Sequence, residues 1–244
     1  MREPKREQLT RREVLGMLGV AGVAAWAGRV PLSSPTGAAD QFDCVATPAQ
    51  TEGPYFVDER LNRADIRLDP ATQLLSAGIP LHLGISVGRV EGASCAPLAG
   101  ALVDVWQCDA LGVYSDVRDN NDRFDTRGKQ FLRGYQVTDR NGQVEFLTVY
   151  PGWYRGRTVH IHFKVRVPHS NRGGREFTSQ LYFDDALTDL VHGNPPYNSK
   201  GKRDTLNPQD GIYRAGNSGE GLLLRVERAA QGYRGNFSVG LRMS

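Results

Sequence analysis

The chain has 244 residues, 39% hydrophobic and 23% charged, which is an ordinary globular composition with enough length for one large β domain or two small ones. Its formal net charge of +3 comes from the start of the chain, because residues 1–39 hold six basic and three acidic residues and leave 24 of each sign for the remainder. A neutral remainder excludes the broad positive field of a nucleic-acid-binding protein.

Residues 1–39 predict an export signal and linker, followed by one domain over residues 40–244. Arg11 and Arg12 precede an apolar run from Val14 to Ala27, a pattern that resembles a twin-arginine signal. The run is shorter than the ~20 residues that a membrane-spanning helix needs, which favours a cleaved signal over an anchor. After the signal is removed, we expect no stable membrane anchor. We therefore expect the protein to be secreted, periplasmic or located at the cell surface. A retained N-terminal anchor is the alternative.

Three cysteines follow the leader, at Cys44, Cys95 and Cys108. In an oxidising compartment Cys44 and Cys95 can pair and leave Cys108 free, but the spacing does not fix the connectivity. No Cys-x-x-Cys pair is present, so the sequence argues against structural zinc.

Short alternating or apolar runs between turn residues dominate the rest of the chain and predict strands. The runs cover residues 81–87, 101–107, 134–137, 144–149, 160–167, 179–183, 222–226 and 237–241. Helical periodicity is scarce. We therefore predict an all-β fold, a β-sandwich of mixed or antiparallel sheets with long active-site loops.

The connections between these runs carry their own signals. Asp139-Arg140-Asn141-Gly142 predicts a tight hairpin turn, because Asn-Gly supplies the positive φ angles that such a turn needs. A short helix is expected near Asp185 to Val191, with Asp184 as its cap. Two long loops, residues 115–129 and 192–219, are each expected to be either functional or flexible.

The run Thr158 to Val165 places two histidines one residue apart on a predicted strand. Side chains alternate along a strand, so His160 and His162 share one face while Ile161 and Phe163 point to the other. The apolar face fits a core, and the histidine face then lines a polar cavity or a metal. The alternative is a pair of hydrogen-bonded or exposed histidines.

The sequence around these histidines resembles the iron-binding core of the intradiol ring-cleavage dioxygenases, the catechol and protocatechuate dioxygenase family. The matching segments are residues 151–163 (PGWYRGRTVHIHF) and residues 104–115 (DVWQCDALGVYS). The resemblance implies one Fe³⁺ per chain, and its four ligands would be Tyr114, Tyr154, His160 and His162. Ferric iron is a hard cation that phenolate oxygens stabilise, which suits these residue types.

The resemblance also implies an activity and further site residues. The family cleaves catecholic rings between the two hydroxylated carbons with dioxygen, giving cis,cis-muconate-type diacids. Tyr154 would be the ligand that substrate displaces, Arg157 would lie beside the substrate ring, and Gln180 would pack beside Arg157. Tyr55, in the segment Thr51 to Phe56, would line the pocket. The alternatives are a surface ion pair for Arg157, a backbone hydrogen bond for Gln180 and a Gly-Pro turn around Tyr55.

The sequence leaves several features of the pocket and its partners open. Five residues separate Tyr154 from His160, fewer than in the cytoplasmic catabolic members, which shortens one pocket wall. The resemblance implies a small catecholic substrate and dioxygen as partners, does not distinguish among catechols, and leaves a homo-oligomer open. A cupin site is disfavoured because the first glutamate after His162 is distant Glu176. The rival function is a secreted, non-catalytic β-sandwich binding module.

Overall fold

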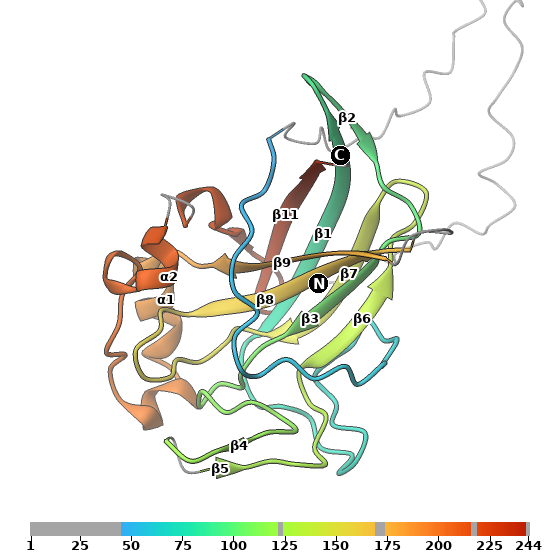
Figure 1. Ribbon diagram of the computed structural model, residues 1–244. Helices are drawn as coiled ribbons and strands as arrows, with labels where there is room; N and C mark the ends of the chain where they lie inside the picture. The colour runs from blue at the N-terminus through green and yellow to red at the C-terminus, as the bar shows by residue number, and fades with distance from the viewer. Residues whose placement is uncertain (1–44, 122–123, 169–173, 216–218, 243–244) are drawn as a thin grey trace, which may run out of the picture. The chain divides into compact units, whose positions relative to one another are not determined.

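Residues 45–121, 124–168, 174–215 and 219–242 are described in the computed structural model (Figure 1). They all lie within the unit Gln41–Ser244. The predicted export signal of residues 1–39 lies outside them, and so does Cys44. Within the described ranges, no helix is long and apolar enough to cross a bilayer.

The first sheet is built around the long strand β1 (Pro80–Glu91). One edge of β1 pairs in parallel with β11 (Tyr233–Arg242), which pairs antiparallel with β10 (Arg225–Arg228). The other edge pairs antiparallel with β7 (Gln143–Val149) and then with β2 (Ser94–Pro97). The 12 residues of β1 are long enough to hold two partners in succession along one edge.

The second sheet has the order β6-β3-β8-β9 and is antiparallel throughout. Its strands are β6 (Arg133–Val137), β3 (Leu102–Trp106), β8 (His160–Val167) and β9 (Arg175–Tyr182). A two-stranded ribbon, β4 (Arg118–Asp119) and β5 (Phe124–Asp125), lies in the first long loop. The predicted all-β fold with mixed and antiparallel sheets is confirmed.

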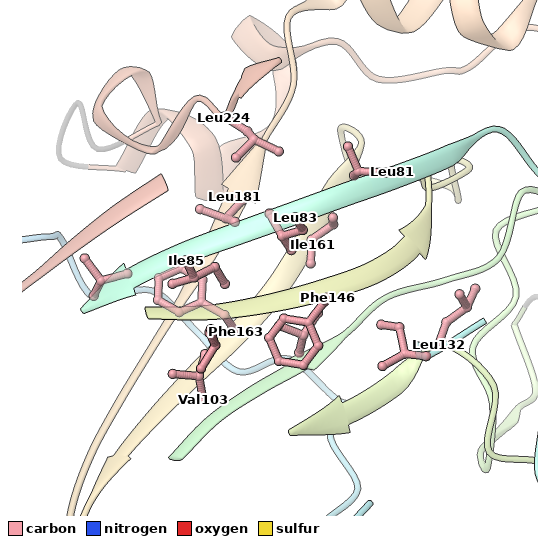
Figure 2. Close-up of a cluster of buried hydrophobic side chains, with 14 of the residues drawn as sticks. Leu81, Leu83, Ile85, Val103, Leu132, Phe146, Ile161, Phe163, Leu181 and Leu224 are labelled. Carbon is pink, nitrogen blue, oxygen red and sulfur yellow. The ribbon is translucent and has the colours of Figure 1, made fainter. Parts of the chain in front are cut away.

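The core lies where the two sheets face each other. Figure 2 shows Leu83 and Ile85 of β1 and Phe146 of β7 close to Ile161 and Phe163 of β8. All five side chains are buried. Since Ile161 and Phe163 point into this core, strand alternation sends their even-numbered neighbours to the outer face of the second sheet.

Short helical elements lie before, within and after the second long loop. The helix α1 (Asp185–His192) begins as predicted, with the Asp184 side chain accepting a hydrogen bond from the Leu187 backbone N–H. The short elements η1 (Tyr197–Lys200), η2 (Asn207–Gln209), α2 (Gly211–Arg214) and η4 (Glu220–Leu222) follow. The predicted strand over residues 222–226 is therefore shifted, because η4 ends at Leu222 and β10 begins at Arg225.

The predicted turn at Asp139 to Gly142 exists, but the prediction that its two flanking strands pair as a β-hairpin is wrong. Gly142 has a φ of 74°, and its N–H donates to the Asp139 carbonyl over 2.9 Å. Beyond the turn, however, β6 pairs with β3 and β7 pairs with β1. The turn thus carries the chain from one sheet to the other, because strand pairing is decided by long-range contacts.

The cysteines with described positions fall into two states. Cys95 is disulfide-bonded, and Cys108 is a buried free thiol. Burial raises the pKa of the Cys108 thiol, so it stays protonated and acts as a small apolar side chain.

Candidate metal centre

The outer face of β8 holds the two predicted histidines. His160 and His162 are 2% and 1% exposed, because the segment from Ala46 to Asn62, here called the N-terminal strap, crosses this face (Figure 1). Gly53 of the strap has a φ of 71°, and a Cβ there would lie 3.4 Å from His162 Cε1. That distance is an ordinary van der Waals contact, so the strap lies directly on the His162 ring, and the positive φ is what favours glycine at this position.

Four aromatic donors converge at one end of this face. The Nε2 atoms of His160 and His162 are 3.1 Å apart, and the Tyr154 hydroxyl is also 3.1 Å from His160 Nε2. The Tyr114 ring centroid lies 5.7 Å from that of Tyr154 and 6.3 Å from that of His162. Tyr114 is 1% exposed, and its hydroxyl lies near that of Tyr154 but makes no hydrogen bond of good geometry within the described ranges. The two phenols and two imidazoles share one centre.

His160 is held in a tautomer that can bind a metal, whereas His162 Nδ1 is buried without a hydrogen-bond partner among the described residues. His160 Nδ1 lies 2.6 Å from the Thr158 carbonyl oxygen, which can only accept, so Nδ1 is assigned the proton. Its Nε2 lone pair then points at the centre, as in histidines that bind metals. Burial lowers the pKa of both histidines, which keeps the rings neutral and available as ligands.

The phenols need a cation to ionise. Burial raises the pKa of Tyr154 to about 12 against the opposing effect of Arg157, and burial raises the pKa of Tyr114 as well. A bound cation would release these protons and gain two anionic oxygen ligands. In the described ranges no three His, Cys, Asp or Glu side chains cluster to bind a metal. The donor set therefore depends on the tyrosines, and it fits hard ferric iron.

Arg157 is fixed beside this centre by two partners. Its Nε donates to Asp210 Oδ2 over 2.8 Å, and its Nη2 donates to Gln180 Oε1 over 2.6 Å. Its Nη1 lies 3.5 Å from His160 Nε2. Gln180 also donates through Nε2 to the Thr51 carbonyl over 2.9 Å, so it contacts both the arginine and the backbone. The structure thus brings Arg157 and Gln180 together at the predicted place.

The sequence profile of a family described as Dioxygenase matches residues 51–192. The chain belongs to this dioxygenase family. Its members are known to use non-haem iron, in agreement with the donor set above. The matched range begins within the strap and contains all four predicted ligands.

The curated relatives that the chain resembles carry dioxygenase names as well. The chain is 34% identical over 152 residues to catechol 1,2-dioxygenase 2 of Acinetobacter lwoffii, covering 57% of this chain and 51% of the relative. The chain spans about half the length of the curated relatives it matches.

Solved structures agree over more of the chain. An intradiol ring-cleavage dioxygenase from Tetranychus urticae is 28% identical with a TM-score of 0.69, covering 82% of this chain and 95% of that one. The dioxygenase domain of a carbohydrate-binding fusion protein from Streptomyces sp. SirexAA-E is 29% identical with a TM-score of 0.55, covering 82% and 100%.

Tyr55 joins the aromatic cluster at the candidate site. Its ring stacks on Tyr114 with centroids 4.5 Å apart and an interplanar angle of 22°, and it meets Tyr154 edge-on at 5.9 Å. Its hydroxyl donates to Asp119 of β4, which ties the strap to the first long loop. The structure therefore places Tyr55 against the predicted ligands, with its hydroxyl directed at a carboxylate.

Two site residues were missed by sequence reasoning. Asp210 anchors Arg157 and also accepts the Thr158 N–H over 2.9 Å and the first free N–H groups of α2. An aspartate directly before a helix is a recognisable cap, but nothing local tells that its second oxygen reaches Arg157. Trp106 stacks on His162 with centroids 4.9 Å apart and an angle of 8°. It lies within the matching segment 104–115 but carried no predicted role.

Proposed function

We propose that this chain is a ferric, non-haem intradiol dioxygenase that cleaves catecholic rings between the two hydroxylated carbons and forms cis,cis-muconate-type diacids. The observation that carries the proposal is the convergence of Tyr114, Tyr154, His160 and His162 within one buried cluster. One Fe³⁺ per chain would be held by these four residues. When bound, the ferric ion activates a catecholate ring for reaction with dioxygen.

Tyr154 is suited to handle a proton. It is 9% exposed against 1% for Tyr114, and Gly156, with a φ of 77°, lies two residues further on in the exposed turn that follows it. Tyr154 would therefore be the ligand that yields to substrate, and its phenolate oxygen would accept a proton from one catechol hydroxyl. Tyr114 is buried under Tyr55 and would stay in place.

Arg157 is suited to stabilise negative charge on the ring. Asp210 and Gln180 hold two of its nitrogens, so the guanidinium faces the centre in a fixed orientation. A fixed cation at the place where charge develops lowers the barrier more than a mobile one. Both atoms of dioxygen enter the diacid and the electrons come from the catechol, so the reaction requires no external reductant.

The test is spectroscopic first and catalytic second. Iron-loaded protein should absorb visible light through phenolate-to-iron charge transfer, and Tyr114→Phe or Tyr154→Phe should shift or bleach the band. Oxygen uptake with catechol, protocatechuate, hydroxyquinol and 4-methylcatechol, with analysis of the products, then identifies the substrate. Colourless protein that holds zinc or no metal would contradict the proposal and favour a non-catalytic binding module.

We further propose export by the twin-arginine route to the periplasm, the cell surface or the medium. Arg11 and Arg12 before the apolar run support it, and so does the disulfide at Cys95, because disulfides persist in oxidising compartments. Fractionation of cells that express the full chain tests it, with Arg11→Lys/Arg12→Lys as the variant. Unchanged export of that variant would contradict the route.

A further inference from the structure

Four side chains form a row across the outer face of the second sheet. In the β3–β6 register Trp106 lies opposite Arg133, and in the β3–β8 register it lies opposite His162. In the β8–β9 register His162 lies opposite Gln180. Directly opposed residues of antiparallel strands share a face and lie in contact range. The row therefore connects the metal centre to a residue on the far edge strand.

Arg133 anchors the segment that carries Tyr114. It is 2% exposed, and its Nη2 and Nε donate to the Ser115 carbonyl oxygen over 2.6 and 3.2 Å. Its Nε also donates to Ser115 Oγ over 2.9 Å. Ser115 directly follows Tyr114, so Arg133 fixes the backbone next to a proposed ligand. The third guanidinium nitrogen, Nη1, is buried and has no hydrogen-bond partner among the described residues.

Trp106 supplies the second unpaired donor of this row, after Arg133. Its ring lies nearly parallel to His162 and meets Phe56 of the strap edge-on, with centroids 4.8 Å apart. The side chain is 1% exposed, and its Nε1–H likewise finds no acceptor in the described part of the chain. A buried indole N–H usually has a partner, because an unpaired one loses its hydrogen bond to water without replacement.

Both donors line one small cavity together with an acceptor. Glu59, Trp106 and Arg133 contribute to its wall, and its volume is about 10 Å³. Glu59 Oε2 accepts from Gln130 Nε2 over 2.6 Å, whereas Glu59 Oε1 is buried and unpaired within the described ranges. The Asp116 carboxyl lies within hydrogen-bonding range of the Glu59 carboxyl, so it competes with a water for this acceptor. A cavity of this size holds about one water molecule, and two donors with one acceptor satisfy such a water.

We infer that this cavity binds one ordered water molecule, which accepts from Trp106 Nε1 and Arg133 Nη1 and donates to Glu59 Oε1. The water locks the Trp106 ring against His162 and links it to the arginine that holds Ser115. Tyr114 and His162 thereby share one anchor, although they come from different elements. This second step rests on the proposed function, whereas the water site itself does not. Glu59, Trp106 and Arg133 are positioning residues.

A crystal structure of the full chain tests the site directly. We expect one water oxygen at about 2.7–3.2 Å from Trp106 Nε1, Arg133 Nη1 and Glu59 Oε1. A cavity closed by a direct Trp106–Glu59 hydrogen bond, or one without ordered density, overturns the inference. The result does not depend on iron. Water present in a protein that binds no iron would refute the proposed function alone, and an active iron enzyme without the water would refute only this inference.

Two variants of one residue test the link to the metal centre. Glu59→Leu removes the acceptor and should expel the water, shift the visible charge-transfer band and speed iron release to a chelator about tenfold, as the loss of outer-shell contacts does elsewhere. Glu59→Gln keeps an acceptor oxygen and should restore the band and the release rate to within threefold of wild type. Equal bands and rates in all three proteins would overturn the positioning role.

Discussion

The outward face of β8 holds two different sites within seven residues. At one end His160 and His162 are buried, neutral and grouped with two phenols. At the other end Lys164 forms ion pairs with Glu52 and Glu176, and Arg166 forms ion pairs with Asp58 and Asp104. The same strap covers both ends.

The difference lies in where the neutralising charge comes from. The chain supplies carboxylates to the Lys164–Arg166 end, so each cation has an anionic partner and the ion pairs close within the protein. At the histidine end, the Asp210 carboxylate pairs with Arg157, and neither a histidine nor a proposed phenol ligand pairs with a carboxylate among the described residues. Phenols that ionise there need a cation from outside. A strand face thus becomes a metal centre when its donors are left without protein counter-charges.

The largest effect is expected from removing a donor. His162→Ala deletes one of the four proposed ligands and should lower the affinity for iron by at least about 100-fold, since loss of outer-shell partners alone costs 10–100-fold. Iron content and the visible band of the purified protein measure it. His82→Ala changes an exposed histidine of β1 and is the matched control. Full iron content in His162→Ala would contradict the assignment of the histidine end of β8 to metal binding.

Arg157→Lys should lower kcat/KM by about 10²–10³ while the protein keeps its iron. A lysine keeps the charge but cannot bond Asp210 and Gln180 and still face the centre, and one fixed electrostatic contact in the transition state is worth that range. Oxygen-uptake kinetics with iron quantification measure it. Arg155→Lys, on the exposed turn nearby, is the control. A parallel loss of iron would assign Arg157 to metal retention instead.

Lys164→Met tests the other end and should affect stability alone. Lys164 is 5% exposed, lies 3.9 Å from the Phe56 ring centroid and pairs with two partly exposed glutamates. Methionine keeps the apolar stem, so we expect a loss of about 1 kcal/mol in the free energy of unfolding. Urea denaturation measures the loss, and the visible band should not move. A bleached band would show that the two ends are coupled.

Tyr55→Phe should have the smallest effect. It removes the hydroxyl that donates to Asp119 and keeps the ring on Tyr114, so the change in kcat/KM should stay below about threefold. Tyr55→Ala, which also removes the stacked ring, should shift the visible band. If the phenylalanine variant behaved like the alanine variant, the hydroxyl and its carboxylate partner, not the stack, would set the geometry of Tyr114.

The sequence predicted best what is encoded locally. His160 and His162 share a face because strands alternate, and Tyr154 lies close to them in the chain, so one short segment fixes much of the centre. The capped helix α1 is local in the same sense. Tyr114 came from a second motif matched to a known family, not from any physical signal that joins the two segments.

What the sequence did not show is set by contacts between distant segments. Asp210 reaches Arg157 across 53 positions, through a loop whose path no periodicity reveals. The strands β2, β4 and β5 have two to four residues, too few for alternation to be recognised. At Gly142 the turn chemistry was readable, but whether its two arms pair with each other or with other strands depends on the packing of the whole sandwich.

The strap also limits where the proposed export signal could be cleaved. The Thr47 N–H donates to the Gly240 carbonyl over 2.9 Å, and the Gly240 N–H returns to Thr47 Oγ1 over 2.8 Å, so the strap is fastened to β11 at its first residues. A peptidase that cut beyond Thr47 would remove this fastening and leave the strap held by its bonds to β9 at Pro48, Gln50 and Thr51. If the proposed export signal is removed, a cleavage point upstream of Thr47 would keep the whole strap on the sheet, and a cut within the strap would expose His162 without touching any proposed ligand.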